Sequence, residues 1–545
     1  MFESAMKPIW WLPTFGFFLF LAIESWMFFH PDHIFADPGV GRHLRTAEFI
    51  LETGEIPHTD PLSFSKAGER WTDFEWGFEA TIGELYRAGG LALVCAFCYA
   101  IFAATILGIY RTLLHSGLSL SVVMLTTCIA FLTVQIHFSA RPVLFTYLFM
   151  ALVVEVWRRR SYPLLRDWLI LPVVFAAWAN LHAGWMAALA FLGISIFGRL
   201  LDRLLKRADG DEAPLIPWIG LTLLCTFATS LNPWGWDLHR HLILVTTTFK
   251  SIAYLVEDQP PDFSTPSMSG ITVMFILAVV FMARVSARAP LWRWAIIVTV
   301  LIALHAGLRT PQHQLVVALF VLMVLFMVWA SKRELSWRWE MALPVLFFLY
   351  EGMKAQRHVI LLMEIAAVPV ARDLEVVLHG RWWPYLRERL RGFQVKQRLA
   401  GGDAWLALVA ALALGALLVR TPIGAQIQVG ESASPRLVAF IRDHPDRFHR
   451  PLTTTWNAGP LLWNARPDFR VSMDDRFDFY GDATIFSLVN MMNCSAGWKE
   501  TLRKGNYDSL ILDPYLPLNK RLQSLPEWKV VYRDKNAVVY WKGAN

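Results

Sequence analysis

Residues 89–112 read GGLALVCAFCYAIFAATILGIYRT, an apolar stretch whose one charged residue, Arg111, stands near its end. About 20 apolar residues in a helix cross the hydrocarbon core of a bilayer, so this stretch predicts a membrane span. The whole chain agrees with this, because 55% of its 545 residues are hydrophobic, 17% are charged and the mean hydropathy is +0.40. Too few polar residues remain to cover a soluble fold of this size.

Similar apolar stretches recur along most of the chain, often with Trp or Tyr near their ends, as is typical of membrane interfaces. The pairs within 167–199 and 339–371 each allow either one long bent helix or two short ones. The expected fold class is an α-helical polytopic membrane protein with about thirteen transmembrane helices. The predicted spans are 8–29, 89–112, 119–138, 142–157, 167–180, 182–199, 214–231, 270–287, 291–307, 312–331, 339–353, 357–371 and 403–420.

Lysine and arginine residues gather in alternate connections between these spans, and cytoplasmic loops carry such an excess. The basic connections are 158–166, 199–207, 284–293, 332–338 and 372–398. We therefore expect these connections and the N-terminus inside the cell, and residues 30–88, 232–268 and 421–545 outside it. The formal charge of +7 follows from this topology, so no nucleic-acid partner is expected.

The last part of the chain changes in character after residue 420. Alternating strand-like stretches at 509–513, 528–532 and 537–541, together with a helical stretch at 435–443, predict a small α/β domain. We therefore divide the chain into a transmembrane module, 1–420, and a soluble extracytoplasmic domain, 421–545. The acidic run MDDRFD at 473–478 is either a sugar or cation site or a loop with helix caps.

The first outer loop, residues 30–88, holds polar residues that the spans do not need. Two of its stretches have helical spacing, and we expect two short amphipathic helices on the outer membrane surface. Their apolar faces consist of Leu44, Ala47, Ile50 and Leu51, and of Phe74, Phe78, Ile82 and Leu85. The turns between them are expected at Gly54, Pro57, Pro61 and Gly68.

The acids of this loop are the catalytic candidates: Asp37, Asp60, Asp73, Glu75 and Glu79. Asp37 follows the first span closely, near the depth of a lipid phosphate, and Arg42 and His43 lie next to it in sequence. A partly desolvated carboxylate at this depth can remove a proton from an acceptor hydroxyl. Asp37 and Asp73 also stand where helices are expected to begin, so helix capping is the alternative role of both.

Cationic residues at the predicted outer span ends are candidates for holding a phosphate, because the guanidinium fork suits phosphate oxygens. They are Arg141, Arg309, Arg357 and His358; the alternative for each arginine is a headgroup anchor. Asn180 and His182 interrupt an apolar stretch and are expected either as scaffold or as acceptor contacts. His30, His33, His43 and His58 lack the spacing of a metal site, and the five cysteines indicate no disulfide framework.

Several short motifs resemble those of the GT-C glycosyltransferases, the superfamily of protein O-mannosyltransferases and the lipid A aminoarabinose transferase. The motifs are Asp37, His43, Gly54-x-Ile56-Pro57, Asp60-Pro61-x-Ser63-Phe64, Trp71, Glu75-Trp76, Arg141-Pro142, 178–184 (WANLHAG), 232–235 (NPWG), Arg357-His358, Asp475-Arg476 and Tyr480-Gly481. They span almost the whole chain and are similar to those of an uncharacterised bacterial branch.

This resemblance implies a transferase of the bacterial inner membrane that uses a polyprenyl-phosphate-linked sugar and a cell-envelope acceptor, with no cofactor or metal. Asp37 would be the catalytic base and Glu75 its partner carboxylate. Substrate contacts would come from His43, Arg141, Asn180, His182, Arg357 and His358, the last two on the leaving lipid phosphate. The alternative is a transporter or flippase of a lipid-linked saccharide. Transporters often carry internal repeats, and the sequence has none.

Overall fold

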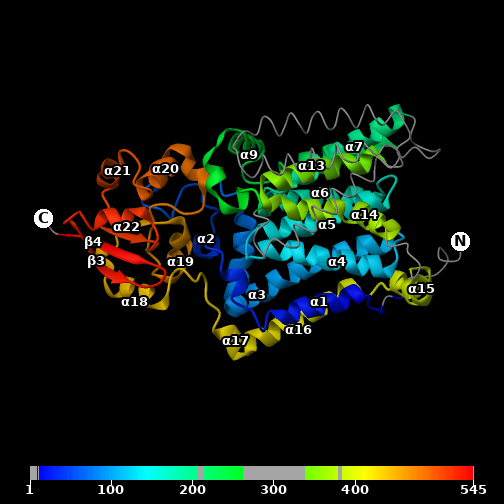
Figure 1. Ribbon diagram of the computed structural model, residues 1–545, viewed down its shortest axis with the longest axis horizontal. Coiled ribbons are helices and arrows are strands. Elements are labelled where there is room, and N and C mark those ends of the chain that lie inside the picture. Colours follow the sequence, from blue (N-terminus) through cyan, green and yellow to red (C-terminus); the bar gives the residue numbers. More distant parts are fainter. Residues whose placement is uncertain (1–8, 10, 206–213, 262–337, 378–382, 544–545) are drawn as a thin grey trace.

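The computed structural model describes residue 9 and residues 11–205, 214–261, 338–377 and 383–543. Figure 1 shows a helical bundle at one side and a smaller lobe of C-terminal residues at the other, with α2 between them. The bundle and its connections contain α1 (Phe15–Trp26), α3 (Trp76–His115), α4 (Leu120–Val134), α5 (Val143–Arg159), α6 (Leu165–Leu181), α7 (Trp185–Leu204), α8 (Leu215–Ala228), α9 (Trp236–Thr248), α13 (Trp339–Lys354), α14 (Val359–Val377), α15 (Trp383–Leu399) and α16 (Asp403–Arg420).

Ten of the predicted spans coincide with helices, and the other three, between 270 and 331, lie outside the described residues. Both ambiguous pairs form two helices each: α6 and α7 are separate, as are α13 and α14. Three described helices are long and apolar enough to cross a membrane on their own: α3, α7 and α16. The chain is accordingly a mostly helical membrane protein with a small mixed sheet.

The longest helix, α3, is interrupted where the first loop meets the membrane span. Gly90 has φ 64° and ψ −163°, a backbone conformation that is essentially restricted to glycine. The helix before the break belongs to the loop, and the helix after it is the apolar stretch 91–115. Glycine at position 90 therefore allows one continuous segment to form first a helix of the loop and then a helix of the bundle.

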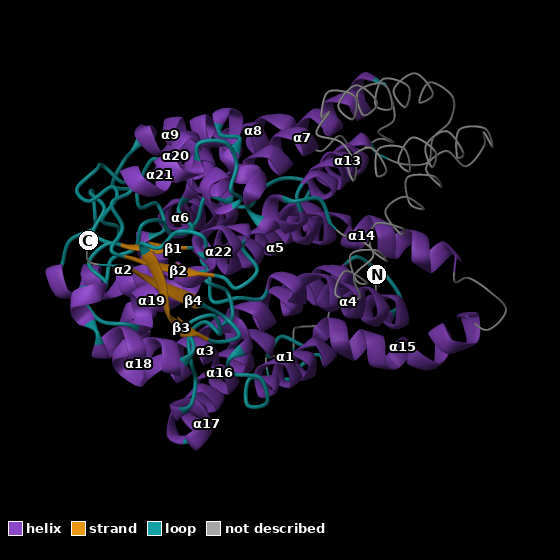
Figure 2. Ribbon diagram, turned by 60° about the vertical axis from the view of Figure 1, so that its left-hand side comes forward, coloured by secondary structure: helices purple, strands orange, loops and turns teal. Residues whose placement is uncertain are grey.

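The C-terminal lobe is a four-stranded sheet with helices around it (Figure 2). Strand order is β1-β2-β4-β3, in which β1 pairs parallel with β2 and the other two pairings are antiparallel. The lobe contains α18 (Pro435–Asp443), β1 (Pro451–Thr453), α19 (Thr455–Asn464), α20 (Phe477–Met492), α21 (Trp498–Lys504), β2 (Ser509–Leu512), α22 (Pro517–Leu522), β3 (Trp528–Arg533) and β4 (Val538–Lys542), whereas the short α17 (Pro422–Ala425) packs against α16 and α3 of the bundle. The predicted strands and the helix at 435–443 are confirmed, whereas β1 was missed because it has only three residues.

The first loop packs against protein on both sides. Helix α2 (Gly39–Thr53) lies against α3 and α19, and its residues Leu44 and Ala47 are buried. Gly41 of α2 and Gly459 of α19 approach so closely that neither has room for a Cβ atom. The prediction that this helix lies on the membrane surface is therefore wrong, because its apolar face is covered by α3 rather than by lipid.

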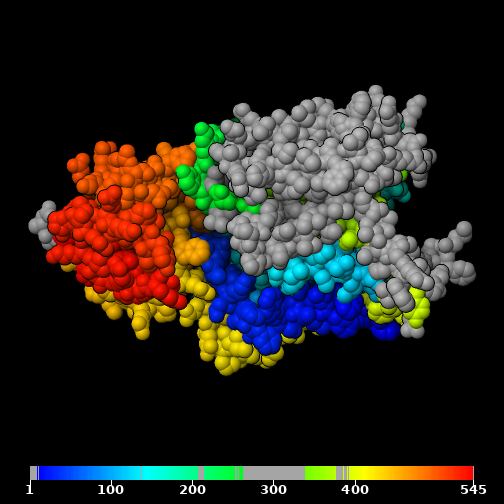
Figure 3. Space-filling model, in the orientation of Figure 1, coloured from blue at the N-terminus to red at the C-terminus, as the bar shows by residue number. Residues whose placement is uncertain are grey.

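The loop also enters the core of the C-terminal lobe. Leu62 is buried with apolar residues of that lobe, and Ser63 forms a parallel bridge with Val471. Figure 3 shows the lobe's surface meeting that of the N-terminal residues. The division into residues 1–420 and 421–545 stays a prediction, but the contacts show that residues 62–64 pack within the same core as the lobe.

Candidate active site

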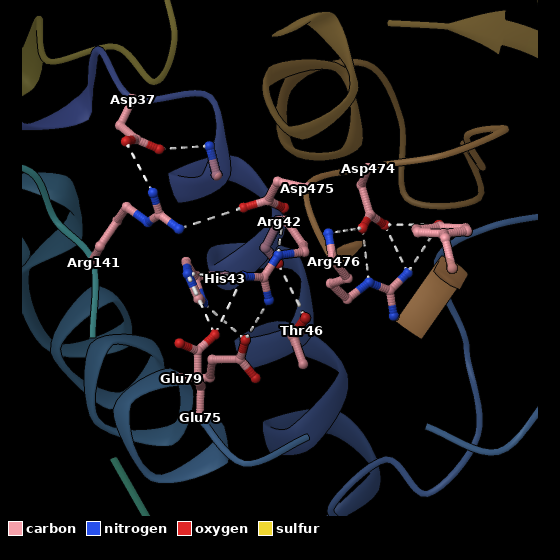
Figure 4. Close-up of polar contacts among 12 residues, drawn as sticks. Asp37, Arg42, His43, Thr46, Glu75, Glu79, Arg141, Asp474, Asp475 and Arg476 are labelled. Atoms are coloured by element: carbon pink, nitrogen blue, oxygen red, sulfur yellow. Dashed lines mark hydrogen bonds and ion pairs between the residues drawn. The ribbon is translucent and has the colours of Figure 1, made fainter. Parts of the chain in front are cut away.

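A group of charged side chains occupies the junction between the bundle and the C-terminal lobe (Figure 4). Its members come from the start of α2, the start of α3, the connection before α5, residues 257–258 and the segment before α20. Helix ends and short connections place them there, so their side chains are held by a rigid scaffold while their polar ends face one another.

Asp37 precedes the N-cap residue of α2, Pro38, and faces Arg141. Its Oδ1 accepts a hydrogen bond from the Gly39 amide at 2.8 Å, and its Oδ2 lies 3.4 Å from Arg141 Nη1. The side chain is 25% exposed, so one carboxylate oxygen stays available beside the guanidinium. Burial raises the pKa of Asp37 above its ordinary value, although Arg141 and the Gly39 amide act in the opposite direction. Asp37 thus binds the first amide of α2 without being its N-cap residue, and the geometry of Oδ2 is compatible with the role of a base.

Arg141 joins three carboxylates from distant parts of the chain. Its Nη1 lies 2.8 Å from Glu257 Oε2 as well as near Asp37, and its Nη2 lies 4.0 Å from Asp475 Oδ2. Burial alone would raise the pKa of Glu257, but Arg141 and Arg357 lower it below its usual value. Glu257 therefore stays ionised, and together with Asp475 it surrounds Arg141 with negative charge.

Arg42 forms a second, buried centre next to the first. Its Nε donates to Asp475 Oδ1 at 2.7 Å, its Nη1 to Glu79 Oε1 at 3.1 Å and its Nη2 to Glu75 Oε2 at 3.4 Å. Burial would lower the pKa of Arg42, but the surrounding carboxylates raise it. Asp475 thus bridges Arg42 and Arg141. The sequence named Arg42 only as a neighbour of Asp37.

His43 lies beneath this centre and is fully buried. Arg42 Nη2 can only donate, so at 2.9 Å it fixes His43 Nε2 as an acceptor. Nδ1 of His43 then donates to Glu79 Oε1 at 2.9 Å. Burial and Arg42 lower the pKa of His43, which agrees with a neutral ring. No part of the His43 side chain is exposed, and in this structure it orients Arg42 and Glu79; its contact with a substrate stays a prediction.

Glu75 lies on the Arg42 side of the group and is 17% exposed. Burial raises its pKa to about 7, against the opposing effect of Arg42 and Arg141. It was predicted as the partner of Asp37, but the carboxylates that share Arg141 with Asp37 are Glu257 and Asp475. The sequence pointed to Asp475 through a family motif and through the acidic run at 473–478. No pattern placed Glu257 beside Asp37, because the contact spans more than 200 residues of chain.

Asn180 and His182 support the loop from the end of α6. Asn180 Oδ1 accepts from Trp76 Nε1 at 3.0 Å, and its Nδ2 donates to two backbone carbonyl oxygens at 2.8 Å. His182 Nδ1 accepts from Thr146 Oγ1 at 2.7 Å and from the Gly184 amide at 3.1 Å. Both polar atoms of the Asn180 side chain are thus bonded to protein groups, which agrees with a role in the scaffold.

Arg357 and His358 follow α13 and pair with different acids. Arg357 Nη2 lies 2.9 Å from Asp258 Oδ1, and the side chain is 37% exposed. His358 Nδ1 lies 3.4 Å from Glu351 Oε2. Because Arg357 also acts on Glu257, it belongs to the charged group around Arg141, whereas His358 pairs within its own helix hairpin.

The side chains of the acidic run at 473–478 have two different roles. Arg476 is buried, with Nη2 lying 2.6 Å from Asp474 Oδ2 and 2.8 Å from Asp60 Oδ1. Its guanidinium also lies 4.3 Å from the Trp71 ring centroid. These contacts fasten the loop to the lobe and leave Asp60 no free role, while Asp475 points to the site. Within the described residues, no His, Cys, Asp and Glu side chains are grouped as ligands for a metal ion.

No family model and no curated protein matches this sequence. Among solved structures, the fold is similar to the apo oligosaccharyltransferase of Archaeoglobus fulgidus, with 10% identity, a TM-score of 0.44 and coverage of 91% of this chain and 69% of that chain. It is also similar to ArnT from Cupriavidus metallidurans bound to undecaprenyl phosphate, with 13% identity, a TM-score of 0.42 and coverage of 96% and 97%. Both proteins fall in the GT-C group that the sequence motifs resemble. Similarity at this level concerns the fold and carries no argument about substrate.

Proposed function

We propose that this chain is a membrane glycosyltransferase of the GT-C type. It would move a sugar from a polyprenyl-phosphate-linked donor to an extracytoplasmic acceptor, which is a cell-envelope glycan, lipid or protein. The observation that carries this proposal is the partly exposed Asp37 carboxylate beside Arg141, within a charged group that also includes Arg357. A carboxylate and two guanidinium groups are the base and the phosphate ligands that such a transfer needs.

The proposed step can be written atom by atom. The acceptor hydroxyl gives its proton to Asp37 Oδ2 while its oxygen attacks the anomeric carbon of the donor. The bond between that carbon and the phosphate oxygen breaks, and the electron pair stays on the lipid phosphate, which Arg141 and Arg357 stabilise. The raised pKa of Asp37 favours its taking up the proton. Asp37 then returns the proton to water.

The proposed orientation places the N-terminus in the cytoplasm and the C-terminal lobe outside a bacterial inner membrane. It is supported by the arrangement along the bundle: α15, which carries Lys396 and Arg398 in its last turn, lies at the end opposite to the lobe (Figure 1). Basic residues belong on the cytoplasmic side. The charged group would then face the outer leaflet, where lipid-linked sugars and envelope acceptors meet.

The test is a transfer assay with purified protein in detergent, undecaprenyl-phosphate-linked sugars carrying a radiolabel, and a cell-envelope extract as acceptor. We expect labelled acceptor together with free undecaprenyl phosphate, and we expect Arg141→Gln to lower the yield by about 10²-fold or more. The matched control is Arg87→Gln on α3, where the side chain is 51% exposed and lies outside the charged group. The proposal is overturned if no donor is consumed while the protein moves the same lipid across vesicle membranes, since that outcome identifies a flippase.

A further inference from the structure

A second group of polar side chains lies at the carboxyl ends of the parallel strands β1 and β2, and the proposed reaction does not use it. Thr454 directly follows β1 and Asp513 directly follows β2. Thr454 Oγ1 donates to Asp513 Oδ1 at 3.2 Å, and Asn457 Nδ2 donates to the same oxygen at 2.8 Å. In open sheets of α/β type, ligands bind outside the carboxyl ends of the strands.

This group retains unused hydrogen-bond acceptors. Asn457 is fully buried, and its Oδ1 has no hydrogen-bond partner among the residues that the structure describes. Asp513 is partly exposed, and both of its side-chain hydrogen bonds from described residues end on Oδ1, which leaves Oδ2 open. An unmet buried acceptor costs free energy, so a ligand or water that donates hydrogen bonds is favoured here.

Two aromatic side chains flank the group and face solvent. Trp456, two residues after Thr454, is 53% exposed, and Tyr515, two residues after Asp513, is 92% exposed. Single exposed aromatics need no explanation, but these two each follow, by two residues, one of the residues of the group, Thr454 and Asp513. Rigid rings with a polar tip are the side chains that proteins use to bind ligands with both apolar and polar faces.

The group is also close to the proposed active site. Thr453, the last residue of β1, donates from Oγ1 to the Met473 carbonyl oxygen at 3.4 Å. Asp475, which contacts Arg42 and Arg141, comes two residues after Met473. With 3.8 Å for each Cα step, and with the spans from the Thr453 and Met473 Cα atoms to the bonded oxygens included, the distance from Thr454 to Asp475 is on the order of 20 Å or less. An extended ligand of this length would reach both places.

We propose that Thr454, Asn457 and Asp513, together with Trp456 and Tyr515, form a subsite for a saccharide portion of the acceptor. This rests on the proposed function and specifies a carbohydrate among its acceptor classes. A sugar hydroxyl supplies the donor that Asp513 Oδ2 lacks, while the buried Asn457 holds Asp513 in place through Oδ1, and the C–H face of a pyranose ring covers an aromatic ring. A lipid chain would leave Asp513 Oδ2 unmet.

The test measures saccharide binding to the purified full-length protein in detergent, with chitotetraose, maltotetraose and mannotetraose as probes in calorimetry. We expect at least one probe to bind the wild type, and Trp456→Ala and Asp513→Asn each to raise its Kd tenfold or more. Asp513→Asn keeps Oδ1 for Thr454 and Asn457 and replaces only the free acceptor, so the fold is retained. Asp468→Asn, with a side chain that is 76% exposed on the same lobe, is the matched control.

The subsite is overturned if the wild type binds none of the three probes, or if both variants bind as the wild type does. Undecaprenyl phosphate binding is measured in parallel with the same preparations. Loss of lipid binding from the wild type with retained saccharide binding would count against the proposed transferase alone. Retained lipid binding without saccharide binding would count against the subsite alone.

Discussion

Replacing Asp37 by asparagine separates the two roles that this carboxylate can have. In the Asp37→Asn protein, the new amide oxygen can still accept the hydrogen bond from the Gly39 amide, so this contact with the first residue of α2 is retained. The attraction to Arg141 is lost, but burial outweighs this attraction in the raised pKa of Asp37, so the ionised carboxylate adds little net stability. Arg141 keeps Glu257 at 2.8 Å. We therefore expect the free energy of unfolding to change by about 1 kcal/mol or less.

The effect on transfer should be much larger, because the amide cannot take up a proton and a positioned base contributes roughly 10²- to 10⁴-fold in rate. The assay is sugar transfer from an undecaprenyl-phosphate-linked donor under single-turnover conditions, with thermal unfolding measured on the same samples. Asp32→Asn is the matched control, since Asp32 is in the same loop and its Oδ1 accepts only a backbone hydrogen bond, from Gln428, at 3.0 Å. Transfer by the Asp37→Asn protein within about threefold of the wild type would refute the assignment of Asp37 as base.

Three further predictions concern the donor, pH and orientation. Arg357→Lys should weaken the use of the lipid-linked donor by about tenfold, because an ammonium cannot bind phosphate through two parallel hydrogen bonds; equal KM values for the donor would contradict this. The pKa of Glu75 is raised to about 7, so the folded protein holds this proton where the unfolded chain has lost it, and stability falls as pH rises from about 4.5 to about 7. Glu75→Gln should therefore lose less stability than the wild type between pH of about 5 and about 8, as thermal melts at the two pH values will show. The orientation can be tested in a Cys494→Ser background with an impermeant thiol reagent. The reagent should label Tyr515→Cys in intact cells and Phe393→Cys only after lysis. Labelling of Phe393→Cys in intact cells would contradict the proposed orientation.

In the first loop, local sequence patterns predicted the helices and turns but not what the helices pack against. Helical spacing located α2 and the start of α3, and glycines and prolines located the turns between them. The same spacing could not identify what covers the apolar face of α2, because lipid and a neighbouring helix select the same side chains. The buried contact of α2 with α3 and α19 is a property of the tertiary structure alone.

The sequence by itself determined the membrane class, most span positions, the strands of the C-terminal lobe and Asp37 as the first candidate, because each follows from composition or from a short periodic pattern. Only the tertiary structure decided which charges meet. Arg42 and Asp475 are 433 residues apart, and Arg476 and Asp60 are 416 apart, so no local pattern relates them. Burial decided the rest: it placed His43 out of reach of solvent, raised the pKa of Glu75 and left Asp37 partly exposed beside Arg141. Desolvation and charge pairing depend on the complete environment of a side chain, and that environment exists only once distant segments have packed together.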